Sequence, residues 1–252
     1  MNDQPQAPKG FFDGSPKMIF IFGLVSGIAA MSLLGGDIQL PSATKADTGT
    51  TVTAPTTAPT TAPVAKGAMP AITSKDHVRG DLKKAKVVMV EYGDFQCPFC
   101  ARHHPTMQAI SEKYGDDIAW VFRHYPLSFH PNGQPSALAS ECASDQGKFW
   151  EFADVMFEKQ SEMNAAGTLP TSFYTAIAKD LGLNTSKFDT CMTDKKFQSI
   201  VDADQAGGNT AGVSGTPATF LNGTMVTSSS GNSVGAAPQA TFDAIIDGLL
   251  KK

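Results

Sequence analysis

The sequence predicts one α/β domain with a helical insertion, which follows an apolar segment and an extended linker. A strand pattern, a helix pattern and a second strand pattern follow one another over residues 86–125. Helix-period segments without a convincing strand fill the region of about 127–211, and a hairpin pattern and a closing helix occupy 218–250. Because 41% of the 252 residues are hydrophobic, the chain can bury a full core.

The N-terminal part of the chain is expected to lie outside this domain. Residues 18–36 carry no charged side chain and would span roughly 28 Å as a helix, which is just enough to cross a bilayer. Lys9 and Lys17 precede this segment, which favours a cytoplasmic tail over residues 1–17. A cleaved signal peptide is the alternative to a transmembrane anchor, because glycines lower the hydrophobicity and the segment is short.

A linker rich in Thr, Ala and Pro follows over residues 37–67 and contains the repeat TAPTTAPTTAP. Such a composition cannot bury enough surface to offset its ordering entropy, so we expect a disordered tether before a domain at 68–252. The net charge of −4 and the lack of a basic-aromatic patch argue against nucleic acid as a partner. All four cysteines fall within the domain, and with export past a membrane this fits an oxidising compartment.

The most informative motif is CPFC at residues 97–100. Residues 86–92 form a continuous apolar run before it, the pattern of a central strand that is buried on both faces. After a short turn, Pro98 suits the first position of a helix, where its missing N–H costs nothing, and this places Cys97 at or beside the N-cap. Residues 118–125 read as a second strand, which completes a βαβ unit.

The rest of the domain reads as helical in its middle and as β structure again near its end. Residues 218–221 and 224–228 flank Asn222-Gly223, a pair typical of a type I′ hairpin turn. An amphipathic helix over 237–250 closes the chain. The helix-period segments of the insertion are 136–145, 148–158, 171–181, 186–192 and 195–206.

Two thiols at this spacing, delivered by a buried strand to a helix N-terminus, indicate a redox site. A thiolate is the nucleophile in disulfide exchange, and an ordinary cysteine with a pKa of about 8.5 is mostly protonated at neutral pH. The N–H groups and dipole of a helix N-terminus stabilise the anion, so we expect Cys97 to attack substrates. Cys100, one turn deeper, is expected to resolve the mixed disulfide.

A zinc site is an alternative interpretation of the same segment, because His103 and His104 follow the two cysteines and supply metal-ligand atoms. Neighbouring side chains on a helix point about 100° apart, so the two histidines cannot easily join one tetrahedron with the cysteines. We therefore predict no metal here and expect the histidines to face the surface or the substrate. The metal content of protein purified without chelator distinguishes the two readings.

Three separated segments resemble the DsbA-like thiol:disulfide oxidoreductases of the thioredoxin superfamily. They are VEYGDFQCPFCARHHP at 90–105, ECASDQGKFWEF at 141–152 and GVSGTPATFLNG at 212–223, in the family's order. The resemblance covers about residues 76–250 and leaves out the apolar segment and the linker. It implies a thioredoxin fold, β-α-β then β-β-α, with a helical insertion, and disulfide exchange that needs no cofactor.

The resemblance also implies roles for residues outside the CPFC motif. Thr216-Pro217 matches the family's cis-proline loop, which faces the two cysteines and offers backbone groups to an extended substrate peptide. Glu91 matches the family's buried acid, which can exchange a proton with Cys100. A buried carboxylate has a raised pKa unless it is paired, and we expect Arg123 on the neighbouring strand to be its partner. A purely structural ion pair between them is the alternative.

The family pattern is broken at Phe99, beside Pro98. Members with histidine between the cysteines gain a cationic neighbour for the thiolate, and because Phe99 offers none we predict a milder oxidant. Some members carry a second disulfide in the helical insertion, where this chain has Cys142 and Cys191. Two separate buried thiols are the alternative to that bond.

Together these features predict a membrane-anchored, extracytoplasmic oxidoreductase, in the periplasm or at the cell surface, that forms or exchanges disulfides in exported proteins. We expect a membrane redox partner to recycle the dithiol or disulfide, and the protein to be a monomer. A disulfide reductase or isomerase of the same fold is the first alternative, because Phe99 leaves the direction of electron flow open. A redox-inactive peptide-binding or chaperone module is the second.

Overall fold

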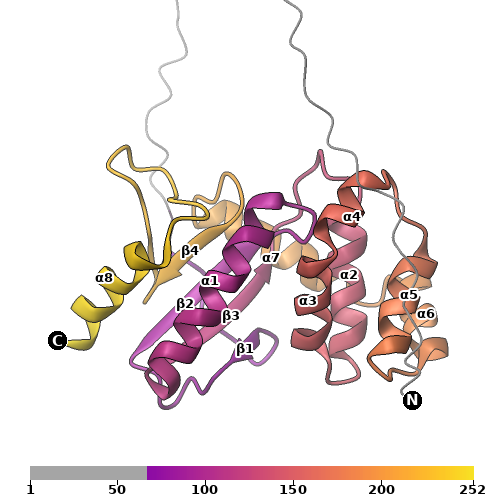
Figure 1. Cartoon of the computed structure of the whole chain (residues 1–252), viewed down its shortest axis with the longest axis horizontal. Coiled ribbons are helices and arrows are strands. Elements are labelled where there is room, and N and C mark those ends of the chain that lie inside the picture. Colours follow the sequence, from indigo (N-terminus) through magenta and orange to yellow (C-terminus); the bar gives the residue numbers. More distant parts are fainter. Residues whose placement is uncertain (1–66) are drawn as a thin grey trace, which may run out of the picture. The chain divides into compact units, whose positions relative to one another are not determined.

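The computed structural model describes residues 67–252, which form a mixed α/β fold around a five-stranded sheet (Figure 1). No helix within this range is long and apolar enough to cross a bilayer. The predicted tail and the predicted anchor at 18–36 lie outside the described residues, as does nearly all of the predicted linker. The strands are β1 (His77–Arg79), β2 (Val87–Gly93), β3 (Ile118–His124), β4 (Ala218–Leu221) and β5 (Thr224–Met225).

The strand order β1-β3-β2-β4-β5 places the strand predicted as central, β2, in the middle of the sheet, with the second predicted strand, β3, beside it. β2 and β3 pair in parallel, and the other neighbours pair antiparallel. Successive side chains of a strand point to opposite faces, so β2 sends Met89 to one face and Val90 to the other. This alternation decides which side chains can meet behind the CPFC motif.

Two helices cover the face to which Met89 points. α1 (Pro98–Tyr114) runs along the sheet with α8 (Gln239–Leu250) beside it, as Figure 1 shows. Met107 of α1 and Phe242 of α8 are fully buried in the core cluster that contains Met89. The helices are therefore held by apolar packing on the sheet, the largest favourable contribution to folding.

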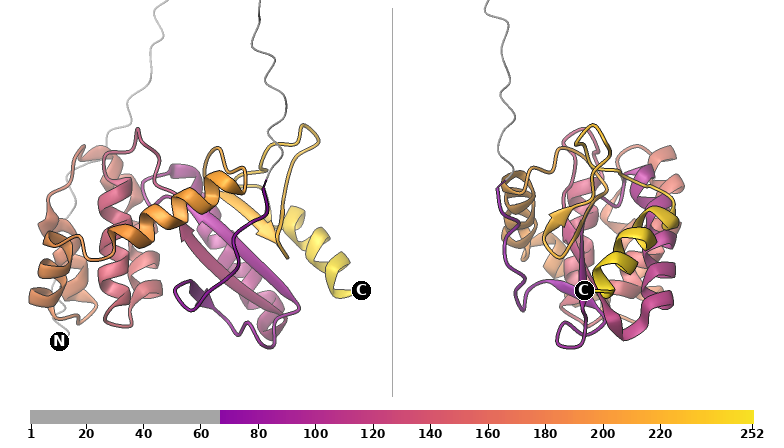
Figure 2. Two further views of the ribbon diagram at one scale, coloured as in Figure 1. Left: turned by 180° about the vertical axis from the view of Figure 1, so that it is seen from behind. Right: turned by 90° about the vertical axis from the view of Figure 1, so that its left-hand side faces the viewer.

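α7 (Gln198–Thr210) crosses the opposite face, which Figure 2 shows from behind. Gly208 allows this close approach, because a Cβ there would lie 2.7 Å from the Tyr125 ring. The Tyr125 hydroxyl donates to the carbonyl oxygen of Val213, 2.9 Å away, and so fixes the chain just after α7. That chain leads directly into the loop that faces the CPFC motif.

The predicted helical insertion is confirmed between β3 and β4. Its helices surround a core cluster that also includes Phe95 and both CPFC cysteines, so the insertion packs against the CPFC motif. Before α7 the insertion contains α2 (Gly133–Ser144), α3 (Phe149–Glu158), α4 (Gln160–Ala165), α5 (Thr171–Asp180) and α6 (Thr185–Thr193).

The structure differs from the sequence-based expectation in three elements. The edge strand β1 and the short helix α4 were not predicted, because three and six residues are too few to display a period. The second hairpin strand ends at Met225 and not at residue 228. The turn itself fits the predicted type I′ geometry, with positive φ at both Asn222 and Gly223.

Candidate active site

The CPFC motif lies at the start of α1, just after the turn that follows β2. Cys97 occupies the N-cap of α1 with extended backbone, φ −71° and ψ 121°, and Pro98 takes the first helical position as the sequence predicts. The backbone N–H of Cys97 donates to the Asp94 carbonyl at 3.0 Å, and its own carbonyl accepts from Ala101 at 3.1 Å. The Cys97 sulfur is thus fixed at the positive end of a 17-residue helix.

The two thiols have opposite acidities. Hydrogen bonding with Cys100 outweighs the effect of burial and, with further hydrogen bonds from the backbone N–H groups of Cys100 and Phe99, lowers the pKa of Cys97 to about 6. Burial, followed by the hydrogen bond and charge of Cys97, raises the pKa of Cys100 well above its ordinary value. At neutral pH, Cys97 is mainly a thiolate and Cys100 a thiol.

A distant loop completes the surroundings of Cys97. The Thr216-Pro217 peptide bond is cis, and the Thr216 carbonyl oxygen lies 3.4 Å from the Cys97 sulfur. These residues are 119 positions apart in sequence. The fold brings them together because β4, which follows Pro217, pairs with β2, which precedes Cys97.

Glu91 is fully buried on β2, behind the two cysteines. Its Oε2 accepts a hydrogen bond from the Trp120 indole N–H at 3.2 Å, while Oε1 has no hydrogen-bond partner among the described residues. Burial raises the pKa of Glu91 to about 8, although the Trp120 hydrogen bond opposes this. Glu91 therefore holds a proton at neutral pH and can give it to a base that forms beside it.

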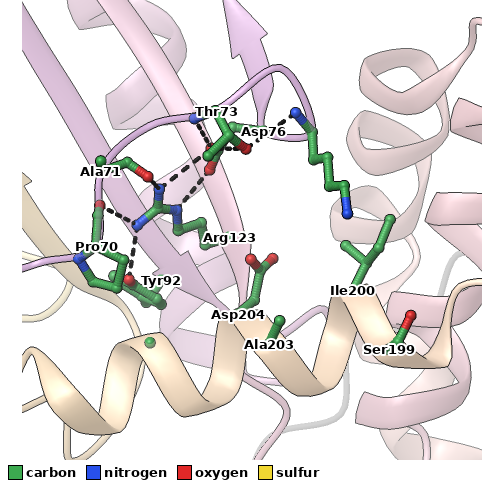
Figure 3. A pocket seen from close by; sticks show the side chains of 12 residues that line it. Pro70, Ala71, Thr73, Asp76, Tyr92, Arg123, Ser199, Ile200, Ala203 and Asp204 are labelled. Atoms are coloured by element: carbon green, nitrogen blue, oxygen red, sulfur yellow. Dashed lines mark hydrogen bonds and ion pairs between the residues drawn. The ribbon is translucent and has the colours of Figure 1, made fainter.

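The expected ion pair between Glu91 and Arg123 is wrong. Glu91 is in register with Phe122, and Arg123, one residue further along β3, points to the other face of the sheet. There it forms an ion pair with Asp76 at 2.6 Å and donates to the Tyr92 hydroxyl and to the Pro70 and Ala71 carbonyls (Figure 3). Arg123 thus lines a separate cavity of about 380 Å³ and fastens the chain before β1 to the sheet.

The expectation that His103 and His104 face the surface or the substrate is also wrong. Both are buried on α1, the first at hydrogen-bond distance from the Thr219 hydroxyl (3.0 Å) and the second from the Asp154 carboxylate (2.7 Å). Burial, and to a lesser degree His104, lowers the pKa of His103 to about 4. The His103 imidazole lies against β4 and Phe242 of α8, and the His104 imidazole lies between the sheet and α3.

Sequence reasoning missed the residues that hold the turn between β2 and α1. The Asp94 carboxylate accepts hydrogen bonds from the backbone N–H groups of Gln96 and Leu127, and it pairs with His130 at 2.7 Å. The Gln96 side chain accepts from the Asn132 backbone at 2.6 Å, and Gln160 donates to the Gln96 carbonyl at 2.7 Å. The only sequence signal was that the polar residues Asp94 and Gln96 stand between an apolar strand and the motif.

A disulfide joins Cys142 on α2 to Cys191 on α6, with a Cα–Cα distance of 5.8 Å. The bond closes a loop of 49 residues, which in the chain-entropy model stabilises the fold by about 4 kcal/mol. We expect replacement of both cysteines by alanine to lower the free energy of unfolding by up to that amount, measured by urea denaturation. Alkylation of the oxidised, denatured wild type should modify no thiol, and modification of two would contradict the bond.

Sequence comparison finds similar segments within longer proteins. The chain is 36% identical over 156 residues to Na(+)/H(+) antiporter NhaA 1 of Salinispora arenicola, covering 62% of this chain and 23% of that protein. It is 35% identical over 155 residues to Na(+)/H(+) antiporter NhaA 1 of Mycolicibacterium vanbaalenii, of which it covers 24%. The chain thus spans about a quarter of the length of the curated relatives it matches.

Structural comparison finds the same fold in DsbA-type proteins. The crystal structure of alpha-DsbA1 from Wolbachia pipientis gives a TM-score of 0.61 at 25% identity, over 71% of this chain and 93% of that one. Oxidised BdbD from Bacillus subtilis gives 0.62 at 23% identity, over 74% and 98%. The family model described as Thioredoxin matches residues 73–247, well over half of the chain. The chain therefore belongs to the thioredoxin family.

Proposed function

We propose that this protein is a thiol:disulfide oxidoreductase that forms or exchanges disulfide bonds in exported proteins through Cys97 and Cys100. The observation that carries the proposal is the asymmetry of the dithiol, since the pKa of Cys97 is lowered to about 6 while that of Cys100 is raised. The Cys97 thiolate is stable and the Cys100 thiolate is not. Substrates are therefore expected to bond to Cys97 and to leave from it, and not from Cys100. The antiport in the names of the longer relatives is not part of this proposal.

In the oxidising direction, a substrate thiolate attacks the Cys97 sulfur of the Cys97–Cys100 disulfide. A mixed disulfide forms, and Cys100 leaves with the electron pair of the broken S–S bond as a thiolate. A second thiolate of the same substrate then attacks the substrate sulfur that is bonded to Cys97, and Cys97 is released as a thiolate. The substrate loses two electrons and becomes a disulfide, and the enzyme gains them as a dithiol.

Glu91 is suited to the proton transfer in the first step. The Cys100 thiolate is unfavourable because burial raises its pKa, so it must take up a proton as it leaves. Glu91 is protonated at neutral pH, and its negative charge, when it forms, is among the causes that raise the pKa of Cys100. We propose that Glu91 supplies this proton and takes one back when the disulfide is formed again.

The loop at Thr216-Pro217 is proposed to hold the substrate peptide. Its carbonyl faces the Cys97 sulfur, and an extended peptide can pair with exposed backbone groups beside a nucleophile. Phe99 is 53% exposed next to this sulfur, with the Arg102 guanidinium 4.6 Å from its ring centre, and it adds an apolar contact for the peptide.

The compartment and the recycling partner are further parts of the proposal. The uncharged segment at 18–36 and the tether after it support a domain held outside the cytoplasm by a membrane anchor. One protein with a similar fold, at 18% identity, is described as a periplasmic thioredoxin-like protein from Salmonella enterica. An oxidase in that compartment needs a membrane partner that takes its two electrons.

Oxidised protein mixed with a reduced two-cysteine test protein provides the direct test. We expect one substrate disulfide to form for each enzyme disulfide consumed, as read by alkylation of both proteins. If no electrons are exchanged, the proposal fails and a redox-inactive module is favoured. Alkylation of the protein trapped in living cells then gives the direction: mostly disulfide indicates an oxidase, and mostly dithiol indicates a reductase or isomerase.

The substitution Phe99→His is expected to raise the reduction potential of the Cys97/Cys100 pair. An imidazolium beside Cys97 stabilises its thiolate and therefore the reduced form, and about 30 mV corresponds to 1.4 kcal/mol for two electrons. We expect a rise of tens of millivolts (roughly 30 mV per pKa unit) in glutathione redox titration, with Phe99→Leu as the neutral control. An unchanged potential in Phe99→His would show that this position does not tune the site.

A further inference from the structure

A second cluster of ligand-type side chains lies apart from the two redox cysteines. The Nε2 atoms of His77 on β1 and His124 at the end of β3 lie 2.6 Å and 2.9 Å from the same oxygen, Oε1 of Glu141 on α2. No motif in the sequence predicted this convergence, because the three residues lie 17 to 64 positions apart. Among the described residues, this is the group of histidine, cysteine and acidic side chains that comes close enough to hold a metal ion.

The donor set and its spacing fit a transition metal. Two imidazole nitrogens and one carboxylate are ligands that suit zinc and its neighbours, and they occur with an open fourth position in zinc enzymes. The three ligand atoms lie within 4.8 Å of one another. Tetrahedral bonds of 2.0–2.1 Å place ligand atoms about 3.3 Å apart. The two nitrogen–oxygen separations of 2.6 Å and 2.9 Å therefore need to open by only about half an ångström, while the two nitrogens start from a separation of no more than 4.8 Å.

The cluster is shielded from solvent but is not closed. The side chains of His124 and Glu141 are 1% and 3% exposed, and that of His77 is 10% exposed. A cavity of about 260 Å³ reaches His77 and Glu141 and is also lined by Asp76, Asp145 and Lys75. Its two aspartates already form ion pairs, Asp76 with Arg123 and Asp145 with Lys196. The cavity provides an entry path and room for a water molecule in the fourth position.

The surroundings also hold the ligands in place. The His77 ring stacks on Phe149 with ring centres 3.4 Å apart and an interplanar angle of 7°. The His124 backbone N–H donates to the Asp204 carboxylate at 3.0 Å, which fixes the end of β3. Because these side chains have little freedom to lose, binding an ion would cost little ordering entropy.

We propose that His77, His124 and Glu141 form a binding site for a divalent transition metal of the zinc class, separate from Cys97 and Cys100. The ion joins β1, β3 and α2, so it ties the edge of the sheet to the helical insertion. This inference does not depend on the proposed redox function. The competing arrangement is a hydrogen-bonded cluster in which both imidazoles donate an Nε2 proton to the carboxylate, and metal binding must displace those protons.

The test uses the full chain in mild detergent, with Cys97 and Cys100 oxidised so that no thiolate can bind metal. Chelator-stripped protein is titrated with Zn²⁺ by calorimetry and with Co²⁺ by visible spectroscopy. We expect one ion per chain, proton release on binding, an intense four-coordinate Co²⁺ spectrum, and a Zn²⁺-dependent rise in melting temperature of several degrees.

Two variants separate a metal site from a hydrogen-bonded cluster. His77→Gln keeps an N–H donor near the Nε2 position, and Glu141→Gln keeps an acceptor, but each loses a metal ligand. We expect the dissociation constant for Zn²⁺ to rise at least about 100-fold in both, while His130→Gln, whose histidine pairs with Asp94 elsewhere, binds as the wild type does. If a variant does not fold, the Co²⁺ spectrum and stoichiometry of the wild type decide. Binding of well under one ion per wild-type chain, or equal binding in all variants, overturns the proposal.

Discussion

Cys97→Ser is expected to reduce catalysed disulfide exchange to the background rate. The hydroxyl of serine does not ionise near neutral pH, so the variant lacks both the thiolate that attacks disulfides and the sulfur that accepts attack. The measurement is the rate at which a reduced test protein acquires its disulfide in a glutathione buffer. Folding should be unaffected, because oxygen replaces sulfur at one N-cap position and serine is a favourable residue there.

Cys100→Ser is the matched control for this experiment. It keeps the Cys97 nucleophile but lacks the thiol that resolves a mixed disulfide, so it should accumulate covalent complexes with substrate, visible on non-reducing gels. Its steady-state exchange should also be very low, but for a different reason. If Cys97→Ser retains exchange or Cys100→Ser traps no substrate, the assignment of the attacking sulfur to Cys97 is incorrect.

Glu91→Gln is expected to stabilise the protein at high pH and to slow its catalysis. The pKa of Glu91 is about 8 in the folded chain against an ordinary value of 4.5, so the folded chain retains a proton that the unfolded chain releases. Glu91 therefore lowers the free energy of unfolding. This loss is absent below pH 4.5, the ordinary pKa of glutamate, and grows until about pH 8, where it reaches several kcal/mol (~5 kcal/mol at most, from 1.36 kcal/mol per pKa unit). Glutamine does not ionise, so it causes no such loss of stability, and its side-chain oxygen can still accept the Trp120 hydrogen bond.

Urea denaturation at two pH values measures this effect. We expect the midpoint of Glu91→Gln to exceed that of the wild type at pH 8 and to match it closely at pH 4, while the exposed Glu158→Gln changes neither. We also expect the release of Cys100 from the mixed disulfide to slow about 100-fold, because the proposed proton donor is lost. Equal midpoints at pH 8 would mean that folding does not raise the pKa of Glu91.

The central part of the fold could be predicted because local patterns and burial agree there. Residues 87–90 and 118–122 are apolar throughout, and the predicted strands that contain them are β2 and β3 of the sheet, with β2 central as expected. Pro98 marked the start of α1, and Asn222-Gly223 marked the hairpin turn. In each case a few adjacent residues are enough to locate the element.

The errors concern side chains whose partners are distant in the sequence. The register between β2 and β3 places Trp120, and not Arg123, on the same face as Glu91. A shift of one residue would move each side chain of a strand to the other face of the sheet. His103 and His104 are polar residues on a helix, and only the packing of the sheet and α3 shows that they are buried. The cluster of His77, His124 and Glu141 could not be found, because β1 was not predicted.

The hydrogen bonds of the turn before Cys97 have a consequence for how separable the helical insertion is. Asn132, at the start of the insertion, holds the Gln96 side chain, and Gln160, on α4, holds the Gln96 carbonyl. A minimal version of the protein with only the sheet, α1 and α8 would therefore leave the residue next to the reactive sulfur without its supports. The insertion is part of the scaffold that holds the CPFC motif and is not a removable module.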